Sequence, residues 1–195
     1  MLDLALREAS SIWRKNRKEL QAFLSGRITR QLKDKGRTRS VPEIPVFVFH
    51  SVEPAKFEHQ LIYLAENGYS TVNSNSLVEI LNGKQRPEPR TIALTFDDAT
   101  GSFWSTAFPL LNKHGFGAIL FVIPVLVPED KQNFPNLEDV WCGRARLEDI
   151  LNRERIQPLC TWSELKMMDR SGIVGIQSHS LTHIRINISS GLSTI

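Results

Sequence analysis

The sequence predicts an α/β protein built around a parallel sheet, and three observations support this prediction. Short apolar runs alternate with helix patterns from residue 44 onward. Residues 91–98 read TIALTFDD, an apolar run that ends in two carboxylates. A later apolar run, residues 173–177, is followed at once by His179 and His183. Strands that alternate with helices are typical of a parallel sheet, and functional groups gather beyond the carboxyl ends of its strands.

Residues 1–40 form a basic leader that we separate from the domain at 41–195. The leader holds eleven Lys or Arg against four Asp or Glu, a net +7, so the remaining residues carry −4 of the overall +3. Its apolar positions recur close to every 3.6 residues, which predicts one long or two short amphipathic helices before a turn-prone linker at 36–42. Such a helix packs against a domain or lies on an anionic membrane, and both interpretations remain open.

Composition excludes several classes of protein. The 195 residues are 41% hydrophobic and 23% charged, which suits one globular domain. The first thirty residues lack a secretory signal, and the longest apolar stretch, residues 118–127, holds Pro124 and is too short to cross a bilayer. We therefore expect a cytoplasmic protein, with peripheral membrane contact through the leader as the alternative. Nucleic-acid binding is disfavoured, because no base-reading module accompanies the basic charge.

The first half of the domain follows a strand–helix alternation. Residues 46–49 read as the first strand, with His50 just past its end. A helix pattern at 56–66 stops at Asn67-Gly68, and a short strand follows at 71–72. Ser76 is the expected N-cap of a helix that runs to Leu81.

The second half continues the alternation after the central strand. We expect a helix at 105–114, a strand at 118–122 and a short helix at 146–152. Ser163 is the expected N-cap of a further helix that Gly172 ends, ahead of the last strand at 173–177.

The two polar clusters at the strand ends carry the candidate chemistry. Asp97 and Asp98 place like charges side by side, which is unfavourable unless they share a cation or a proton. Adjacent strand residues point to opposite faces, so the two carboxylates are free to take different roles. His179 and His183, four residues apart, would share one face of a helix and suit a zinc site. The alternatives are a turn or helix cap for the aspartates and a solvated helix start for the histidines.

These residues carry a resemblance to a known family. Residues 95–98 (TFDD) and 179–183 (HSLTH) resemble the first and second motifs of the polysaccharide deacetylases of carbohydrate esterase family four, the NodB-homology domain. Residues 44–52 (IPVFVFHSV) and 67–69 (NGY) also resemble the opening of the subgroup that deacetylates extracellular amino-sugar polymers. The resemblance spans roughly residues 44–185. It implies a distorted (β/α) barrel of the NodB-homology type, preceded here by the helical extension.

The resemblance also implies an activity and a set of roles. Asp98, His179 and His183 would ligate Zn²⁺ or another divalent transition metal, and Asp97 would act as general base. The reaction would be removal of N-acetyl groups from an acetylated amino-sugar polymer or related glycan by metal-activated water. His50 is the candidate substrate-binding residue, with a structural role as its alternative.

The chain departs from the family in two places. Ala99 stands where the family usually has Gly. Three further motifs, which supply an orienting Arg and a general acid, usually follow the second one, whereas twelve residues follow His183 here and Arg185 lies too near to match. We therefore expect an incomplete barrel with open edges and weak or absent turnover, since recruitment of His50 or His114 as the acid is disfavoured. A truncated, catalytically impaired relic that binds a carbohydrate or a partner is the alternative function, and a membrane-surface protein acting through the leader is a third.

The two cysteines are the last candidates for a special role. Cys142 and Cys160 are eighteen positions apart and do not form a paired metal knuckle. In the absence of a secretion signal we expect both to be reduced, buried thiols, with a disulfide as the alternative in an exported protein.

Overall fold

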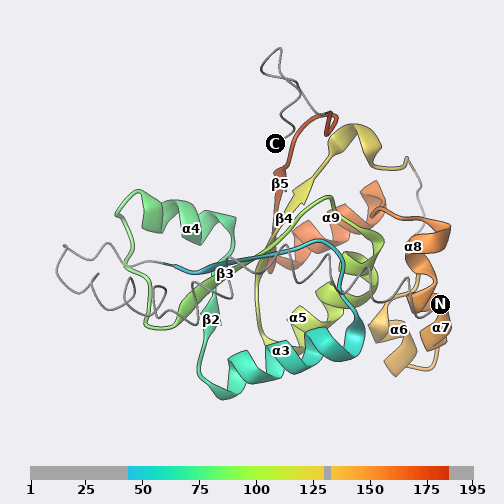
Figure 1. Ribbon diagram of the computed structural model, residues 1–195, viewed down its shortest axis with the longest axis horizontal. Coiled ribbons are helices and arrows are strands. Elements are labelled where there is room, and N and C mark those ends of the chain that lie inside the picture. Colours follow the sequence, from blue (N-terminus) through green and yellow to red (C-terminus); the bar gives the residue numbers. More distant parts are fainter. Residues whose placement is uncertain (1–43, 130–132, 185–195) are drawn as a thin grey trace, which may run out of the picture. The chain divides into compact units, whose positions relative to one another are not determined.

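The computed structural model describes residues 44–129 and 133–184 (Figure 1). The predicted amphipathic leader, the linker at 36–42, the boundary between residues 40 and 41, and Arg185 lie outside the described residues. These predictions therefore stay predictions.

Within residues 44–129 and 133–184, five parallel strands form the sheet. They are β1 (Val46–Phe49), β2 (Ser70–Thr71), β3 (Thr91–Phe96), β4 (Ala118–Val122) and β5 (Val174–Ser178). The order is β1-β3-β4-β5, and β2 pairs with the start of β3. All four strand pairings are parallel, as the alternating pattern predicts, and β4 and β5 stay in register along their whole length. Because the strands are parallel, their carboxyl ends meet at one edge of the sheet.

The sheet is open, which confirms the predicted incomplete barrel. Among the described residues, β1 and β5 end the strand order and do not pair with each other. Every residue of the central strand β3 is buried. By contrast, the side chains of Val46, Phe47 and Val48 on β1 are 53%, 49% and 58% exposed. Strand β3 has paired neighbours on both sides and is buried along its whole length, whereas the edge strand β1 leaves apolar side chains in solvent.

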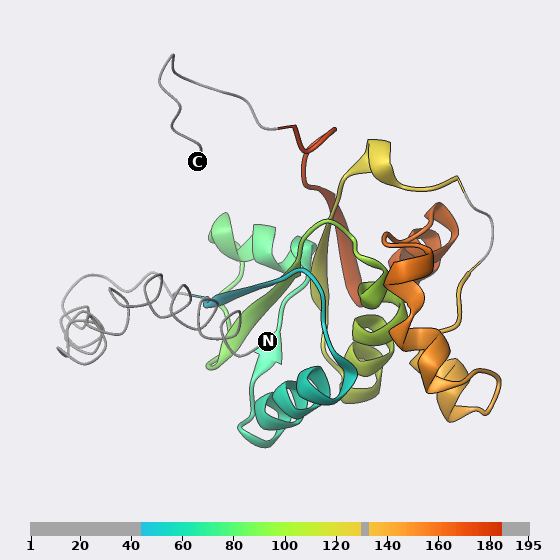
Figure 2. The ribbon, with the colours of Figure 1, turned by 45° about the vertical axis from the view of Figure 1, so that its right-hand side comes forward.

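Helices connect the strands. They are α3 (Pro54–Glu66), α4 (Ser74–Leu81), the π-helix η2 (Phe103–Ala107), α5 (Phe108–His114), the 3-10 helix η3 (Pro124–Leu126), α6 (Leu137–Trp141), α7 (Leu147–Leu151), α8 (Arg153–Ile156) and α9 (Trp162–Ser171). Figures 1 and 2 show α3, α5 and α9 on one side of the sheet and α4 on the other. Across the described part of the chain, every helix falls short of the length and hydrophobicity that a membrane crossing requires.

Two expected N-caps are wrong by a few residues. Asn73, not Ser76, caps α4, and its side-chain oxygen accepts from the Ser76 N–H at 3.0 Å. Thr161, not Ser163, caps α9 in a reciprocal capping box with Glu164. Each helix starts earlier because the upstream residue offers an oxygen to a backbone N–H that would otherwise lack a partner.

The helix expected at 105–114 is present in an altered form. It begins earlier than expected, at Gly101, passes through the π-helical turn η2 and is α-helical again from Phe108. Pro109 lacks the N–H that a regular helix would use and its ring crowds the preceding turn, so a locally wider turn relieves the conflict. The short helices α6 and α8 were not predicted, although Asn136 and Asp139 form a capping box that marks the start of α6.

Both cysteines are free, as predicted, but only one is buried. Cys160 is fully buried, whereas Cys142 is exposed at the end of α6, so the prediction of two buried thiols is wrong for Cys142. Burial, the largest cause, raises the pKa of the Cys160 thiol far above its usual range.

We expect one fast-reacting thiol per native chain. Cys142 should react with an aromatic disulfide reagent at the rate of an ordinary exposed thiol, because the reagent reaches it directly. Cys160 should react only after denaturation. Absorbance of the released chromophore measures both phases, with Cys142→Ser as the control that removes the fast phase. Two fast thiols in the native chain would show that the interior around Cys160 opens readily.

Candidate metal centre

The candidate centre lies at the carboxyl ends of β3 and β5. Asp97 and Asp98 come directly after β3, and the Asp97 N–H donates to the Phe49 carbonyl at 2.8 Å. His179 comes directly after β5, and its N–H donates to the Val122 carbonyl at 2.8 Å. The main chain of β1 therefore holds the first residue of one cluster, and that of β4 holds the first residue of the other. The parallel sheet thus brings together residues that are eighty positions apart in sequence.

Three side chains converge on one point. One ligand atom from each of Asp98, His179 and His183 lies within 4.8 Å of the others. The Asp98 Oδ1 atom lies 3.8 Å from His179 Nε2 and 3.7 Å from His183 Nε2. The two imidazole rings stand perpendicular to each other, with their centroids 5.1 Å apart. The structure therefore assembles the three residues that the sequence singled out as metal ligands.

His183 reaches this point from a turn, so the expected helical face is wrong. Residues 179–184 contain no helix, and His183 has a left-handed backbone with φ 55°. Its N–H donates to the Ser180 hydroxyl at 3.0 Å, which closes the turn. Short polar side chains commonly stabilise turns in this way, and a spacing of four residues suits a turn as well as a helix.

The strand alternation expected for the two aspartates also fails. Strand β3 ends at Phe96, and Asp98 is left-handed with φ 67°. As a result both carboxylates face the same imidazole, with Asp97 Oδ2 and Asp98 Oδ1 each 3.8 Å from His179 Nε2. Asp97 lies beside the three-residue cluster, whereas Asp98 belongs to it. The two carboxylates still occupy different positions relative to the cluster. The left-handed turn at Asp98 causes this difference, and the alternation of a strand does not.

The chemistry and geometry of the donors fit a divalent cation. Asp98 Oδ1 is buried and has no hydrogen-bond partner, because both imidazole nitrogens are too distant to donate to it. A buried carboxylate oxygen without a partner is costly, and a cation would satisfy it. Two imidazoles and one carboxylate are typical zinc ligands, and in a tetrahedral site such atoms lie roughly 3.3 Å apart. The Asp98 Oδ1 atom lies 3.7 Å and 3.8 Å from the two imidazole nitrogens, and all three ligand atoms lie within 4.8 Å of one another, so a cation would draw them closer together.

Ala99 is the chain's departure from the usual Gly, and the structure gives it a left-handed backbone with φ 51°. A left-handed conformation costs an L-residue about 1–2 kcal/mol. Ala99 is also 1% exposed, so its methyl group is buried. The backbone strain and the packing of the methyl group therefore oppose each other at this position.

We expect Ala99→Gly to change the free energy of unfolding by less than about 0.5 kcal/mol. The lost methyl and the added chain entropy together remove about 1.5 kcal/mol, and relief of the left-handed strain returns about 1–2 kcal/mol. Ala118→Gly is the matched control, because Ala118 is equally buried but lies in the regular strand β4, and it should lose about 1.5 kcal/mol. Urea unfolding measures both. Equal losses would mean that Ala99 is not strained.

The other two histidines considered for the site have different surroundings. His50 is exposed after β1, and its carbonyl accepts from the Thr100 hydroxyl at 2.8 Å, which ties it to the loop after Asp98. A substrate contact by its ring stays a prediction. His114 ends α5, and its Nε2 lies 3.3 Å from Glu58 Oε1 on α3. Because α5 leads into the start of β4, His114 lies toward the opposite edge of the sheet from the candidate centre.

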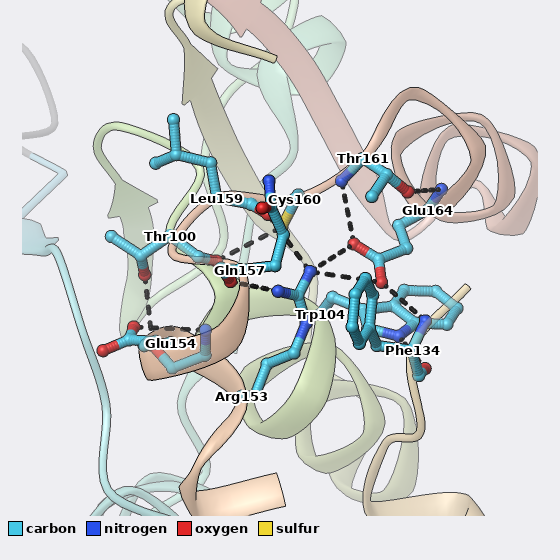
Figure 3. A network of polar contacts seen from close by, with 11 residues as sticks. Thr100, Trp104, Phe134, Arg153, Glu154, Gln157, Leu159, Cys160, Thr161 and Glu164 are labelled. Carbon is cyan, nitrogen blue, oxygen red and sulfur yellow. Dashed lines mark hydrogen bonds and ion pairs between the residues drawn. The ribbon is translucent and has the colours of Figure 1, made fainter. Parts of the chain in front are cut away.

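A third segment reaches the candidate centre, and the sequence did not reveal it. Residues 158–160 run beside the loop that follows Asp98, and an isolated antiparallel bridge joins Thr100 to Leu159. The Gly101 N–H donates to the Pro158 carbonyl at 2.6 Å, and the Cys160 N–H donates to the Ala99 carbonyl at 2.8 Å. Figure 3 shows Thr100, Leu159 and Cys160 together. A loop with no motif of its own therefore supports residues 97–101, the aspartate loop.

An open parallel sheet with this cluster at its carboxyl edge defines an α/β domain with a candidate metal centre. The family model described as polysaccharide deacetylase matches residues 84–192, more than half of the chain. The chain therefore belongs to the polysaccharide deacetylase family.

Relatives agree with this assignment. The chain is 29% identical over 134 residues to the poly-β-1,6-N-acetyl-D-glucosamine N-deacetylase of Escherichia coli K12, an alignment that covers 68% of this chain and 18% of the relative. It is 24% identical over 159 residues to YxkH of Bacillus subtilis, which covers 77% of this chain and 47% of the relative. The chain thus spans about half the length, or less, of these curated relatives.

Solved structures share the fold. The Streptococcus pyogenes deacetylase PplD, in complex with acetate, matches with a TM-score of 0.52 at 21% identity, covering 75% of this chain and 60% of that one. IcaB from Ammonifex degensii matches with a TM-score of 0.52 at 24% identity, covering 70% and 52%. At these identities the likeness establishes the fold alone.

Proposed function

We propose that this chain is a metal-dependent hydrolase that removes N-acetyl groups from an amino-sugar polysaccharide. The observation that carries the proposal is the convergence of Asp98, His179 and His183 around a buried carboxylate oxygen without a partner, with Asp97 beside them. Membership of the polysaccharide deacetylase family supports the reaction class. The name of the E. coli relative supports an acetylated poly-glucosamine as the class of substrate.

Asp98, His179 and His183 are the residues that would hold the cation. Their donor set favours Zn²⁺, with other divalent transition metals as alternatives. A bound Zn²⁺ would polarise the acetyl carbonyl and lower the pKa of water toward roughly 7. Both Nε2 atoms face the same Asp98 oxygen, so one cation would be shared by the three side chains.

Asp97 is the residue that would move the proton. Its carboxylate lies beside the three ligands, and its backbone N–H is fixed by the Phe49 carbonyl. Asp97 would take a proton from the attacking water as the carbon–oxygen bond forms. When the carbon–nitrogen bond breaks, the amine nitrogen needs one proton, which Asp97 would be able to return. The products would be acetate and a free amino sugar.

One observation keeps a binding role without turnover as the second candidate. Among the described residues, His114 is paired with Glu58 near the other edge of the sheet, so it does not supply a separate acid to the candidate centre. Without a separate acid, departure of the amine depends on Asp97 alone. A chain of this kind would still bind an acetylated glycan while turning it over slowly or not at all.

Acetate release tests the proposed function. We would incubate the full chain, loaded with Zn²⁺, with β-1,6-linked N-acetylglucosamine oligomers and with chito-oligomers, and measure acetate in a coupled assay. The expected result is saturable release that is lost in His183→Ala and after chelation. Oligomer binding without acetate would favour the binding role. If the chain neither released acetate nor bound oligomers, both candidates would be wrong.

A further inference from the structure

Arg153, at the start of α8, is a buried charge far from any motif. Its side chain is 1% exposed. Its guanidinium donates to the carbonyls of Gln157 and Leu159, the second at 3.1 Å, and stacks 3.9 Å over the Phe134 ring. Its Nη2 atom lies 3.1 Å from Glu164 Oε2. One side chain therefore holds two consecutive turns of the segment that leads into α9 (Figure 3).

Glu164 completes the anchor from α9. It is 0% exposed, and its carboxylate accepts from the Thr161 and Phe134 N–H groups, each at 2.9 Å. These bonds fix the carboxylate before it meets Arg153. The ion pair is therefore rigid, and both oxygens of the Glu164 carboxylate accept hydrogen bonds.

Stability alone is a poor explanation for this pair. Taking two charges out of water costs several kcal/mol per ion, and apolar residues of similar volume often stabilise a protein equally well. Apolar residues, however, cannot donate hydrogen bonds, so they cannot fix the position of a backbone carbonyl. The planar guanidinium offers donors in a rigid fork, so it sets where the Gln157 and Leu159 carbonyls lie. What the pair adds beyond stability is the fixed position of the Gln157 and Leu159 carbonyls.

Residues 157–160 hold the loop that follows Asp98. Pro158, which lies between the two carbonyls bound by Arg153, accepts from the Gly101 N–H at 2.6 Å. The Cys160 N–H donates to the Ala99 carbonyl at 2.8 Å, and the Cys160 thiol donates to the Thr100 carbonyl at 3.2 Å. The aspartate loop and the 157–160 segment are thus joined at three points.

The aspartate loop needs such a support. Asp98 and Ala99 are both left-handed, with φ 67° and 51°, and neither is a glycine. Each such residue costs about 1–2 kcal/mol and persists only where the surroundings over-determine it. The left-handed backbone of Asp98 is also what turns its Oδ1 toward both imidazoles. Loss of the support would let the loop relax and move the carboxylate.

We propose that Arg153, fixed by Glu164, is a positioning residue for the candidate metal centre. Through residues 157–160 it holds Asp98 in its left-handed conformation and so sets the affinity for the cation. This inference rests on the metal site of the proposed function. It assigns no catalytic contact to Arg153.

Arg153→Lys is the direct test. A single ammonium group does not reproduce the fork that binds two carbonyls and a carboxylate. Loss of residues that orient ligands typically weakens metal binding about 10–100-fold, and we expect about tenfold here because Arg153 acts through an intervening segment. Zn²⁺ affinity of the full chain is measured by competition with a chromogenic chelator. Leu61→Val, a fully buried change on α3, is the control for general destabilisation and should leave the affinity unchanged.

Amide hydrogen exchange in the metal-free chain gives a second readout. The Gly101 and Cys160 N–H groups, which join the two segments, should exchange about tenfold faster in Arg153→Lys and at the wild-type rate in Leu61→Val. This readout separates the two claims. A wild-type chain that binds no Zn²⁺ would overturn the metal site, whereas exchange would still show whether Arg153 holds the loop.

Gly101→Ala is the second variant, because it leaves both charges in place. A Cβ at Gly101 would lie 2.9 Å from the Gln157 carbonyl oxygen and would push the two segments apart. It should weaken Zn²⁺ binding and speed exchange in the same way, even where Arg153→Lys fails to fold. Wild-type affinity and exchange in a folded Arg153→Lys or Gly101→Ala chain would overturn the inference. An equal loss of affinity in Leu61→Val would do the same.

Discussion

Replacing Asp98 or Asp97 by asparagine, one at a time, should affect Zn²⁺ binding and acetate release differently. We expect Asp98→Asn to weaken Zn²⁺ binding by more than about 100-fold, because Asp98 Oδ1 faces both imidazoles and a neutral amide is a poor replacement for a charged ligand. We expect Asp97→Asn to bind Zn²⁺ within a few-fold of wild type, since its carboxylate lies outside the three-residue cluster. Acetate release should nevertheless fall about 10²–10⁴-fold in Asp97→Asn, the range typical of a lost general base.

Two measurements on the same protein samples separate these effects. Chelator competition gives the Zn²⁺ affinity, and the coupled assay gives acetate release at saturating metal. Asp169→Asn, a change of the same kind at an exposed position of α9, should leave both unchanged. If Asp97→Asn lost Zn²⁺ as completely as Asp98→Asn, the two carboxylates would share one role and the assignment of Asp97 as base would be wrong.

The central strand and the candidate ligands were open to prediction because both depend on local patterns. Residues 91–96 are mostly apolar, which is typical of a strand covered on both faces, and the structure buries all six of them. The alternation of strands and helices predicts that both clusters lie at the carboxyl edge of a parallel sheet. It does not predict the strand order, and the structure shows that β3 and β5 both pair with β4, which brings Asp98 and His179 together.

The backbone of the two clusters was beyond sequence reasoning. A spacing of four residues suits a helix and a turn equally, and the choice between them depends on the end of β5 and on the Ser180 hydroxyl. The left-handed backbone of Asp98 is likewise followed by a loop that is tied by hydrogen bonds in both directions to residues 157–160, which are distant in sequence. Tertiary contacts of this kind leave no periodic trace in the sequence.

The burial of Arg153 could not be predicted from the sequence either. A charged residue in a polar stretch is normally solvated, and nothing local marks this one as 1% exposed. Its partner did carry a signal, since Thr161 and Glu164 have the spacing of a capping box and so announce the start of α9. The sequence therefore contained one half of the ion pair, but it did not reveal the other half.

Phe96→Ala should cause the largest loss of stability of any single change considered for this chain. Phe96 is 0% exposed and immediately precedes Asp97. Its ring centroid lies 5.0 Å from that of Phe49, 5.7 Å from Phe57 and 4.6 Å from Phe103. Removing the ring leaves a cavity between β1, α3, β3 and η2, and a buried Phe→Ala change typically costs about 3–5 kcal/mol. For a domain of this size that corresponds to a fall in Tm of roughly 6–20 °C.

Phe47→Ala supplies the matched control. Phe47 lies on the edge strand β1 and is 49% exposed, so its truncation should cost less than about 1 kcal/mol. Urea unfolding of both variants measures the difference. Similar losses of stability would show that the cluster of Phe49, Phe57, Phe96 and Phe103 does not dominate the core. The expected difference would mean that this cluster stabilises the end of β3, from which Asp97 and Asp98 follow. In that case the metal affinity of Phe96→Ala, measured well below its Tm, should also fall, because β1 and β3 jointly fix the backbone of Asp97.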